Sequence, residues 1–148
     1  MRAVRGFSVI ELVTVLVLIG ALAVFALPRL NTAGFSAYGF HEELLAAVRH
    51  AQKTATASRC EVRVEVSASG DDYAVTYTGA GPDGCMAQPV TAPGRGGNLA
   101  GSAPAQVDIN QGATIVFDGF GVPGSAATIE INNRRQVVVE AFTGYVHD

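Results

Sequence analysis

One carboxylate lies inside the most apolar stretch of the chain. From Phe7 to Leu27 the sequence is apolar except at four positions, Ser8, Glu11, Thr14 and Gly20. A carboxylate one turn inside a membrane helix costs about 2.5–3.5 kcal/mol on insertion scales, so an ionisable residue there is a functional candidate. Phe7 lies four residues before Glu11 and shares its helix face. The pattern predicts that Glu11 needs a cationic partner in its apolar surroundings.

The apolar stretch has the length of a membrane span. As a helix, residues 7–27 would extend roughly 30 Å, which matches the hydrocarbon core of a bilayer. Arg2 and Arg5 precede the stretch without an acid, so the positive-inside rule leaves the N-terminus in the cytoplasm and exports the rest. A cleaved secretory signal is the alternative, because Ala21–Ala23 has a small-x-small pattern. Cleavage there would leave an exposed apolar end at 24–27, which favours the anchored interpretation.

The leader and the span together resemble the processing motif of type IV pilins and pseudopilins. The motif reads Gly6-Phe7-Ser8-Val9-Ile10-Glu11, behind a short basic leader and ahead of the apolar stretch. The resemblance implies that a prepilin peptidase cuts between Gly6 and Phe7 and methylates the new N-terminal Phe7. It also implies that Glu11 pairs with the N-terminal amine of a neighbouring subunit. Ser8 stands where threonine is commoner in the family.

The resemblance also divides the chain. It implies a leader peptide at 1–6, a transmembrane and assembly helix at 7–33, and a periplasmic globular domain at 34–148. Pro28 is at the position where a proline often kinks the long pilin helix, and proline removes an i→i−4 hydrogen bond. We therefore expect a bend near Phe25–Leu27.

A second helix is predicted at the start of the globular domain. Apolar residues recur at steps of three and four between 36 and 58, at Phe40, Leu44, Val48, Ala51 and Ala55. The narrow, alanine-rich face predicts close packing on a sheet. His41 and His50 are expected on the solvated side of this helix.

From residue 60 the apolar period changes to two, which predicts strands. Turns are expected at Ser67–Asp72 and Asn132–Arg134, and the Gly- and Pro-rich segment 79–104 is expected to be a long surface excursion. One helix followed by short strands indicates an α+β domain with a mainly antiparallel sheet packed on the helix. The expected strands are 61–66, 73–77, a short one at 88–91, 106–109, 114–117, 128–131, 136–141 and a terminal piece at 144–147.

The globular part carries a second resemblance, to the GspH/FimT-type minor pilin domain. It rests on the segment 44–52 leading into 60–66, and on the later segments 115–121, 128–131, 135–139 and 144–146. The helix-plus-cysteine pattern is also similar to minor pilins of mannose-sensitive haemagglutinin pili. The resemblance implies a pilin-like fold in which a long N-terminal helix packs on an antiparallel sheet.

The chain has two cysteines, Cys60 and Cys85. An exported pair favours a disulfide in an oxidising compartment. Two free thiols are the alternative. A catalytic cysteine is not favoured, because no histidine–acid arrangement accompanies either residue.

Other candidate chemistry is weak. Asp71, Asp72 and Asp83 fit no EF-hand spacing, so no metal site is expected. The segment 94–97 follows no predicted strand and opens no helix, so it is not a nucleotide site. No nucleophile elbow or catalytic acid pair is present, and we expect neither an enzyme nor a cofactor nor a small-molecule substrate.

Nucleic acid is a further alternative, because some relatives of such domains bind DNA. Loss of Arg2 and Arg5 leaves 8 Lys and Arg against 13 Asp and Glu. Arg134 and Arg135 form the only adjacent cationic pair. So few phosphate contacts predict weak, salt-sensitive binding at best, and nucleic acid is not favoured as a partner.

A hydrophobic content of 49% with 16% charged residues excludes a disordered chain. The sequence thus predicts a minor pilin or pseudopilin, anchored in the inner membrane until it joins a filament with other such subunits. Its role would be to initiate or modify a type IV pilus-like filament. A minor pseudopilin of type II secretion and a DNA-binding minor pilin of natural transformation are the alternatives.

Overall fold

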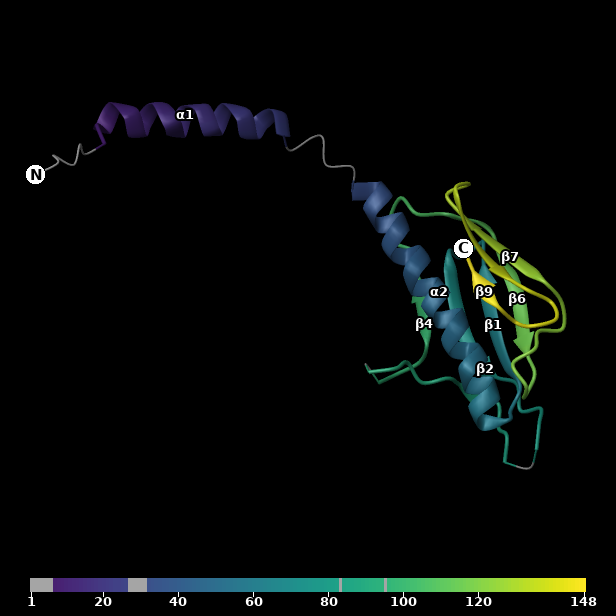
Figure 1. Ribbon diagram of the computed structural model, residues 1–148. Helices are drawn as coiled ribbons and strands as arrows, with labels where there is room; N and C mark the ends of the chain where they lie inside the picture. Colours follow the sequence, from purple (N-terminus) through teal and green to yellow (C-terminus); the bar gives the residue numbers. More distant parts are fainter. Residues whose placement is uncertain (1–6, 27–31, 83, 95) are drawn as a thin grey trace, which may run out of the picture. The chain divides into compact units, whose positions relative to one another are not determined.

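The computed structural model describes residues 7–26, 32–82, 84–94 and 96–148. The chain divides into two units, Met1–Thr32 and Ala33–Asp148, which are described separately (Figure 1). The predicted cleavage site at Gly6 and the predicted kink at Pro28 lie outside the described residues.

The first unit contains helix α1 (Val9–Ala26). Its large apolar side chains from Val9 to Leu22 are all exposed. Among the residues that the structure describes, no helix has both the length and the apolar character of a membrane span.

Helix α2 (Thr32–Ser58) belongs to the second unit from Ala33 onward. The sequence predicted a start at Ser36, because Gly34 and its neighbours are weak helix formers. One glycine costs only about 1 kcal/mol in a helix, and burial of Ala37 and Phe40 in the following turns offsets that cost. The predicted apolar face is confirmed, since its five residues Phe40, Leu44, Val48, Ala51 and Ala55 are all buried. The helix ends where Arg59 takes a left-handed conformation (φ 60°) and Ser58 Oγ accepts a hydrogen bond from the Cys60 amide.

The first sheet has the strand order β3-β2-β1-β6, and every pair is antiparallel. Along β1, Val62, Val64 and Val66 are buried while Arg63 and Glu65 face solvent, as the alternation predicted. A further strand, β4, pairs with the first half of β2, while β3 pairs with its second half. The strands are β1 (Val62–Ser67), β2 (Asp72–Tyr77), β3 (Gln88–Pro89), β4 (Ala100–Ser102) and β6 (Ala113–Phe117).

The second sheet has the strand order β5-β7-β8-β9, again antiparallel. The predicted hairpin at Asn132–Arg134 is confirmed: both asparagines have a φ of 50° and the Arg134 amide donates to the Ile131 carbonyl. Two successive left-handed residues make the tight turn that suits the twist of paired strands. The strands are β5 (Ile109–Gln111), β7 (Ala127–Ile131), β8 (Arg135–Val139) and β9 (Val146–His147).

The expected α+β class and antiparallel pairing are confirmed, but three details were wrong. The strands form two sheets rather than one. The excursion at 79–104 is not only surface, because it contributes β3 and β4 and buries Val90 and Leu99. The strand expected at 106–109 lies instead at Ile109–Gln111, after Gln106 adopts a left-handed φ of 74°.

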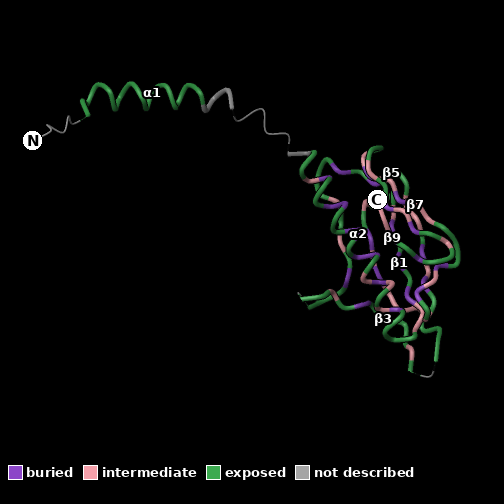
Figure 2. The backbone as a smooth tube through the Cα atoms, in the orientation of Figure 1, coloured by how far each residue is buried: buried purple, intermediate pink, exposed green. Residues whose placement is uncertain are grey.

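The core of the second unit lies between α2 and the two sheets (Figure 2). Both sheets direct alternate side chains inward, as β6 does with Ile115 and Phe117, and β8 with Val137 and Val139. Helix α2 contacts both groups of strands, because Glu43 is hydrogen-bonded to Tyr73 of β2 and His41 to Gln136 of β8. The buried residues of α2 pack in one hydrophobic core with the buried residues of both sheets.

Replacing Leu44 by alanine tests this core. Leu44 is fully buried, so the Leu44→Ala variant should lose about 2–5 kcal/mol of unfolding free energy in urea denaturation. The exposed Lys53 of the same helix supplies the control, because Lys53→Ala should change stability by no more than about 0.5 kcal/mol. Equal, small losses in both variants would contradict the packing described.

Candidate functional site

The first candidate residues lie at the start of the chain's apolar helix. Phe7 precedes α1 and its side chain is 83% exposed. Glu11 lies in the first turn of α1, where its backbone carbonyl accepts a hydrogen bond from Thr14 Oγ1 at 2.9 Å. Within the described residues its carboxylate is exposed and makes no hydrogen bond or ion pair. The charge is therefore available to a group outside this chain.

His41 on α2 corrects the expectation of a solvated histidine. Its side chain is only 2% exposed, and Nε2 donates a hydrogen bond to the Gln136 carbonyl of β8 at 3.0 Å. A carbonyl can only accept, so the hydrogen must lie on Nε2. Among the described residues the other ring nitrogen, Nδ1, is buried without a hydrogen-bond partner, and Glu42 Oε1 lies 3.5 Å from it. His41 thus attaches α2 to the second sheet.

Two further polar side chains of α2 hold the second sheet and its turns. Arg49 donates from Nε and Nη2 to the Val146 carbonyl at 3.1 and 3.0 Å. Gln52 Nε2 donates to the Gly121 carbonyl at 3.0 Å and to the Thr143 carbonyl at 3.4 Å. One amide therefore holds two turns together. The sequence analysis missed both residues, although polar residues that flank an apolar stripe at helical spacing were the available signal.

The two turns held by Gln52 expose three aromatic side chains. Phe120 is 76% exposed, Phe142 92% and Tyr145 62%. Gly144 lets the two turns lie close together. A Cβ at this position, where φ is 65°, would collide with the Gly121 carbonyl. Arg59, at the end of α2, places its guanidinium 5.6 Å from the centre of the Phe120 ring. This aromatic surface therefore lies at the C-terminal end of α2.

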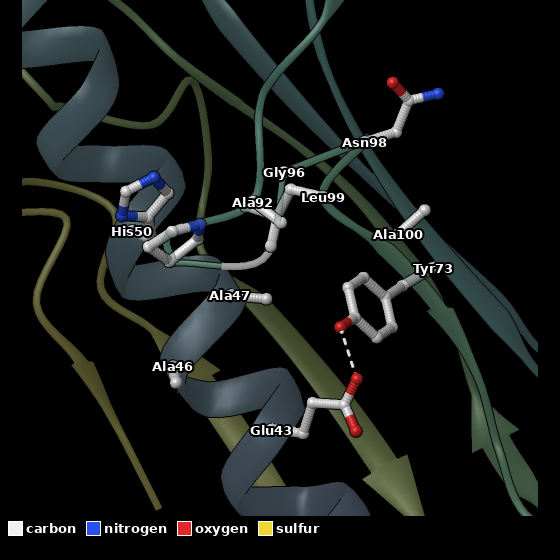
Figure 3. Close-up of a pocket in the computed structure, with 11 residues that line it drawn as sticks. Glu43, Ala46, Ala47, His50, Tyr73, Ala92, Gly96, Asn98, Leu99 and Ala100 are labelled. Atoms are coloured by element: carbon white, nitrogen blue, oxygen red, sulfur yellow. Dashed lines mark hydrogen bonds between the residues drawn. The ribbon is translucent and has the colours of Figure 1, made fainter.

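An open groove lies on the other flank of α2, against β2 and the segment 92–100 (Figure 3). Its volume is about 360 Å³. Tyr73 Oη donates a hydrogen bond to Glu43 Oε1 at 2.8 Å, which joins β2 to the helix at one end of the groove. The described lining is mostly small and apolar, with Ala46, Ala47, Ala92 and Leu99, and it contains no Ser, Thr, Cys or Lys side chain. The groove could accommodate a small apolar group, and its polar lining consists of Glu43, His50, Tyr73 and Asn98.

Cys60 and Cys85 form a disulfide with a Cα–Cα distance of 5.7 Å, as expected. Cys60 follows the end of α2, and Cys85 lies in the segment between β2 and β3. The bond therefore fastens the first part of the 79–104 segment to the helix–strand junction.

Arg134 and Arg135 do not form a broad cationic surface. The Arg135 guanidinium lies over the ring of Tyr38 on α2, 4.9 Å from its centre, while Arg134 is exposed in the hairpin turn. Asp108 lies beside the same turn, because its amide donates to Asn132 Oδ1 at 2.7 Å. Arg135 therefore lies against an aromatic ring, and an acidic residue lies beside the turn that carries Arg134.

Of the three aspartates that the sequence analysis considered for a metal, Asp71 binds a backbone amide. Asp71 Oδ1 accepts from the Ile109 amide at 2.7 Å, which joins the β1–β2 turn to β5. Asp83 lies outside the described residues. Across the described part of the chain, no three His, Cys, Asp or Glu side chains gather at metal-binding distances.

Comparison with protein families gives one match. The family described as "Type II transport protein GspH" matches residues 41–144, which is more than two thirds of the chain. The matched segment starts in α2 at His41 and extends through both sheets to the turn before β9. Searches of curated proteins and of solved structures find no significant match.

Removal of the disulfide should destabilise the globular unit. The bond closes a loop of 25 residues, for which the chain-entropy model gives about 3 kcal/mol. A Cys60→Ser/Cys85→Ser double variant should lose about that much unfolding free energy in urea denaturation. Reductant should lower the stability of the wild type to the same level and leave the double variant unchanged. A double variant as stable as the oxidised wild type would refute the entropic contribution.

The pKa of His147 should lie above the ordinary value of a histidine side chain. The Asp148 backbone carbonyl, 3.1 Å from Nδ1, and then the Glu140 carboxylate, 3.2 Å from Nε2, raise the pKa of His147. Because the folded pKa lies above the unfolded value of about 6.5, this contribution to stability is complete below pH 6.5 and is lost as pH rises through the folded pKa.

An NMR titration of the His147 ring measures this shift. Glu140→Gln should lower the pKa of His147, whereas Glu65→Gln, on the exposed face of β1, should leave it unchanged. An identical titration curve in the wild type and in Glu140→Gln would show that the carboxylate has no effect.

Proposed function

The chain belongs to the GspH family of type II transport proteins, and from this premise we propose that it is a minor pseudopilin. In this role it is a structural subunit that joins other pseudopilins in the filament of a type II secretion system and helps to initiate or modify that filament. The observation that carries the proposal is the family match over α2 and both sheets, on a chain whose first residues carry the processing motif.

The proposed maturation begins in the inner membrane. A prepilin peptidase cuts between Gly6 and Phe7 and methylates Phe7, and the apolar stretch 7–27 anchors the subunit with its globular unit in the periplasm. The exposed large apolar side chains of α1 support this step, because they suit lipid better than water. The Cys60–Cys85 disulfide also agrees with an oxidising compartment.

Glu11 supplies the assembly contact in this proposal. Removal of the leader exposes a charged amine at Phe7, one helical turn from the Glu11 carboxylate. Within one chain the carboxylate has no partner among the described residues. In the filament core it pairs with the amine of a neighbouring subunit, which compensates a charge that would otherwise be buried alone. The contact then selects a defined stagger between adjacent helices.

A DNA-binding role is less well supported. The described residues offer one adjacent arginine pair, Arg134 and Arg135, and Asp108 lies beside the turn that carries Arg134. A surface for duplex DNA needs more cations than this, spread along one face. A type IV pilus remains a related alternative, because it would use the same processing and the same helix contacts.

Intact-mass measurement on protein from its native host tests the maturation step. The mature chain should lack residues 1–6, carry one methyl group on Phe7 and contain the oxidised cysteine pair. Retention of Met1 would exclude the proposed processing.

Substitution of Glu11 tests the assembly step. Breaking one side of a buried ion pair costs several kcal/mol, so Glu11→Ala should be processed normally but enter filaments at least about tenfold less than the wild type. Filament content is measured by immunoblot of sheared fibres against total cell protein. Glu65→Ala removes an equivalent carboxylate from the exposed face of β1 and should assemble normally. Normal incorporation of Glu11→Ala would refute the pairing.

A further inference from the structure

The first turns of α2 expose two aromatic rings, and one of them lies under an arginine of the β7–β8 hairpin. Phe35 is 81% exposed and Tyr38 49% exposed, and their spacing of three residues puts them on one helix face. The Arg135 guanidinium lies over the Tyr38 ring, and Arg134 precedes it in the exposed hairpin turn. We name these four residues the aromatic–arginine patch.

The chemistry of this patch suits the surface of a membrane. Tyrosine is enriched at the headgroup level of bilayers, and phenylalanine is common on the apolar face of helices that lie in this layer. Arginine places its charge on lipid phosphates while its stem covers apolar surface. Anionic phospholipids attract such arginines over short distances. Asp108 beside the turn and Glu42 one turn further along α2 reduce the net positive charge, so the rings must contribute a large part of the binding.

The length of the chain keeps the patch near a membrane that holds the apolar stretch. Five residue steps from Leu27 to Thr32 extend at most about 18 Å, and three helical steps to Phe35 add about 4.5 Å. The headgroup layer begins where the hydrocarbon core ends and is roughly 5–8 Å thick on each side. The patch therefore cannot move far from that layer while the anchor is in the membrane.

The other exposed aromatic surface of the globular unit is not restrained in this way. Phe120 lies beside Arg59 at the far end of α2, and Phe142 directly precedes Thr143, whose carbonyl accepts a hydrogen bond from Gln52. Phe35 and Arg59 are 24 residues apart in the sequence, which corresponds to about 36 Å of helix. Phe142 therefore provides a matched control position with an equally exposed phenyl ring.

On the basis of the proposed membrane-anchored subunit, we propose that the aromatic–arginine patch docks on the anionic phospholipid surface of the membrane before assembly. The Phe35 and Tyr38 rings enter the headgroup layer, and Arg134 and Arg135 bind lipid phosphates. Docking orients the globular unit with its N-terminal end toward the bilayer. Extraction of the subunit into a filament must break this contact.

The chain contains no tryptophan, so a single introduced indole reports on its own surroundings. The full-length Phe35→Trp variant is reconstituted in nanodiscs of phosphatidylcholine and phosphatidylglycerol, with bromine on the acyl chains close to the headgroups. We expect bromine to quench Phe35→Trp fluorescence strongly and the Phe142→Trp control weakly. Adding Arg134→Gln and Arg135→Gln to Phe35→Trp should lower the ratio of docked to undocked protein about thirtyfold.

A third variant separates this inference from the proposed function. Leu12→Trp places the indole on α1, and deeply brominated lipids should quench it if the apolar stretch is in the membrane. If Leu12→Trp is not quenched, the membrane anchor of the proposed function fails. If Leu12→Trp is quenched but Phe35→Trp is quenched no more than Phe142→Trp, the docking proposal alone is overturned. If the double arginine substitution leaves the quenching of Phe35→Trp unchanged, the docking proposal is also overturned. Loss of DNA binding in the same variant would then assign the two arginines to nucleic acid.

Discussion

Burial of one stripe of α2 against two separate sheets is the contact on which the globular unit depends. Small residues such as Ala47, Ala51 and Ala55 are buried along the stripe and let the strands approach closely. The flanks of the stripe are polar, and each flank holds a different sheet: Glu43 binds Tyr73 of the first, and His41 and Arg49 bind carbonyls of the second. The helix therefore joins the two sheets, which among the described residues have no strand in common.

Local periodicity was sufficient to predict α2 and the strand β1, which packs in the same core. Steps of three and four residues gave the buried face of α2, and strict alternation gave the buried face of β1. Periodicity could not predict β4, because Ala100–Ser102 has no large apolar residue; its position depends on pairing with β2, where Gly101 leaves room for the Tyr73 ring. His41 was misplaced for a similar reason. His41 meets the second sheet at Gln136 of β8, which lies 95 residues further along the chain.

The candidate functional residues divide in the same way. The cysteine pair could be predicted because the chain has only two cysteines, and the disulfide confirms it. The processing motif was selected by residue type and spacing and stays a prediction. The stacking of Arg135 on Tyr38 was not accessible, because the two residues meet only through the β7–β8 hairpin and its two left-handed asparagines. Arg134 and Arg135 were therefore considered as a cationic pair for nucleic acid, whereas their neighbours in the fold are an aromatic ring and an aspartate.

The two proposed membrane contacts oppose one another energetically. An unpaired Glu11 in lipid costs about 2.5–3.5 kcal/mol, and a neighbouring amine removes that cost when the subunit enters a filament. Docking of the aromatic–arginine patch favours the membrane state instead, by about 1 kcal/mol for each arginine near an anionic surface. Because these energies are similar, neither contact alone determines whether the subunit stays in the membrane or enters a filament. A subunit with both would stay anchored and oriented while alone, and would leave the membrane only when a partner amine reaches Glu11.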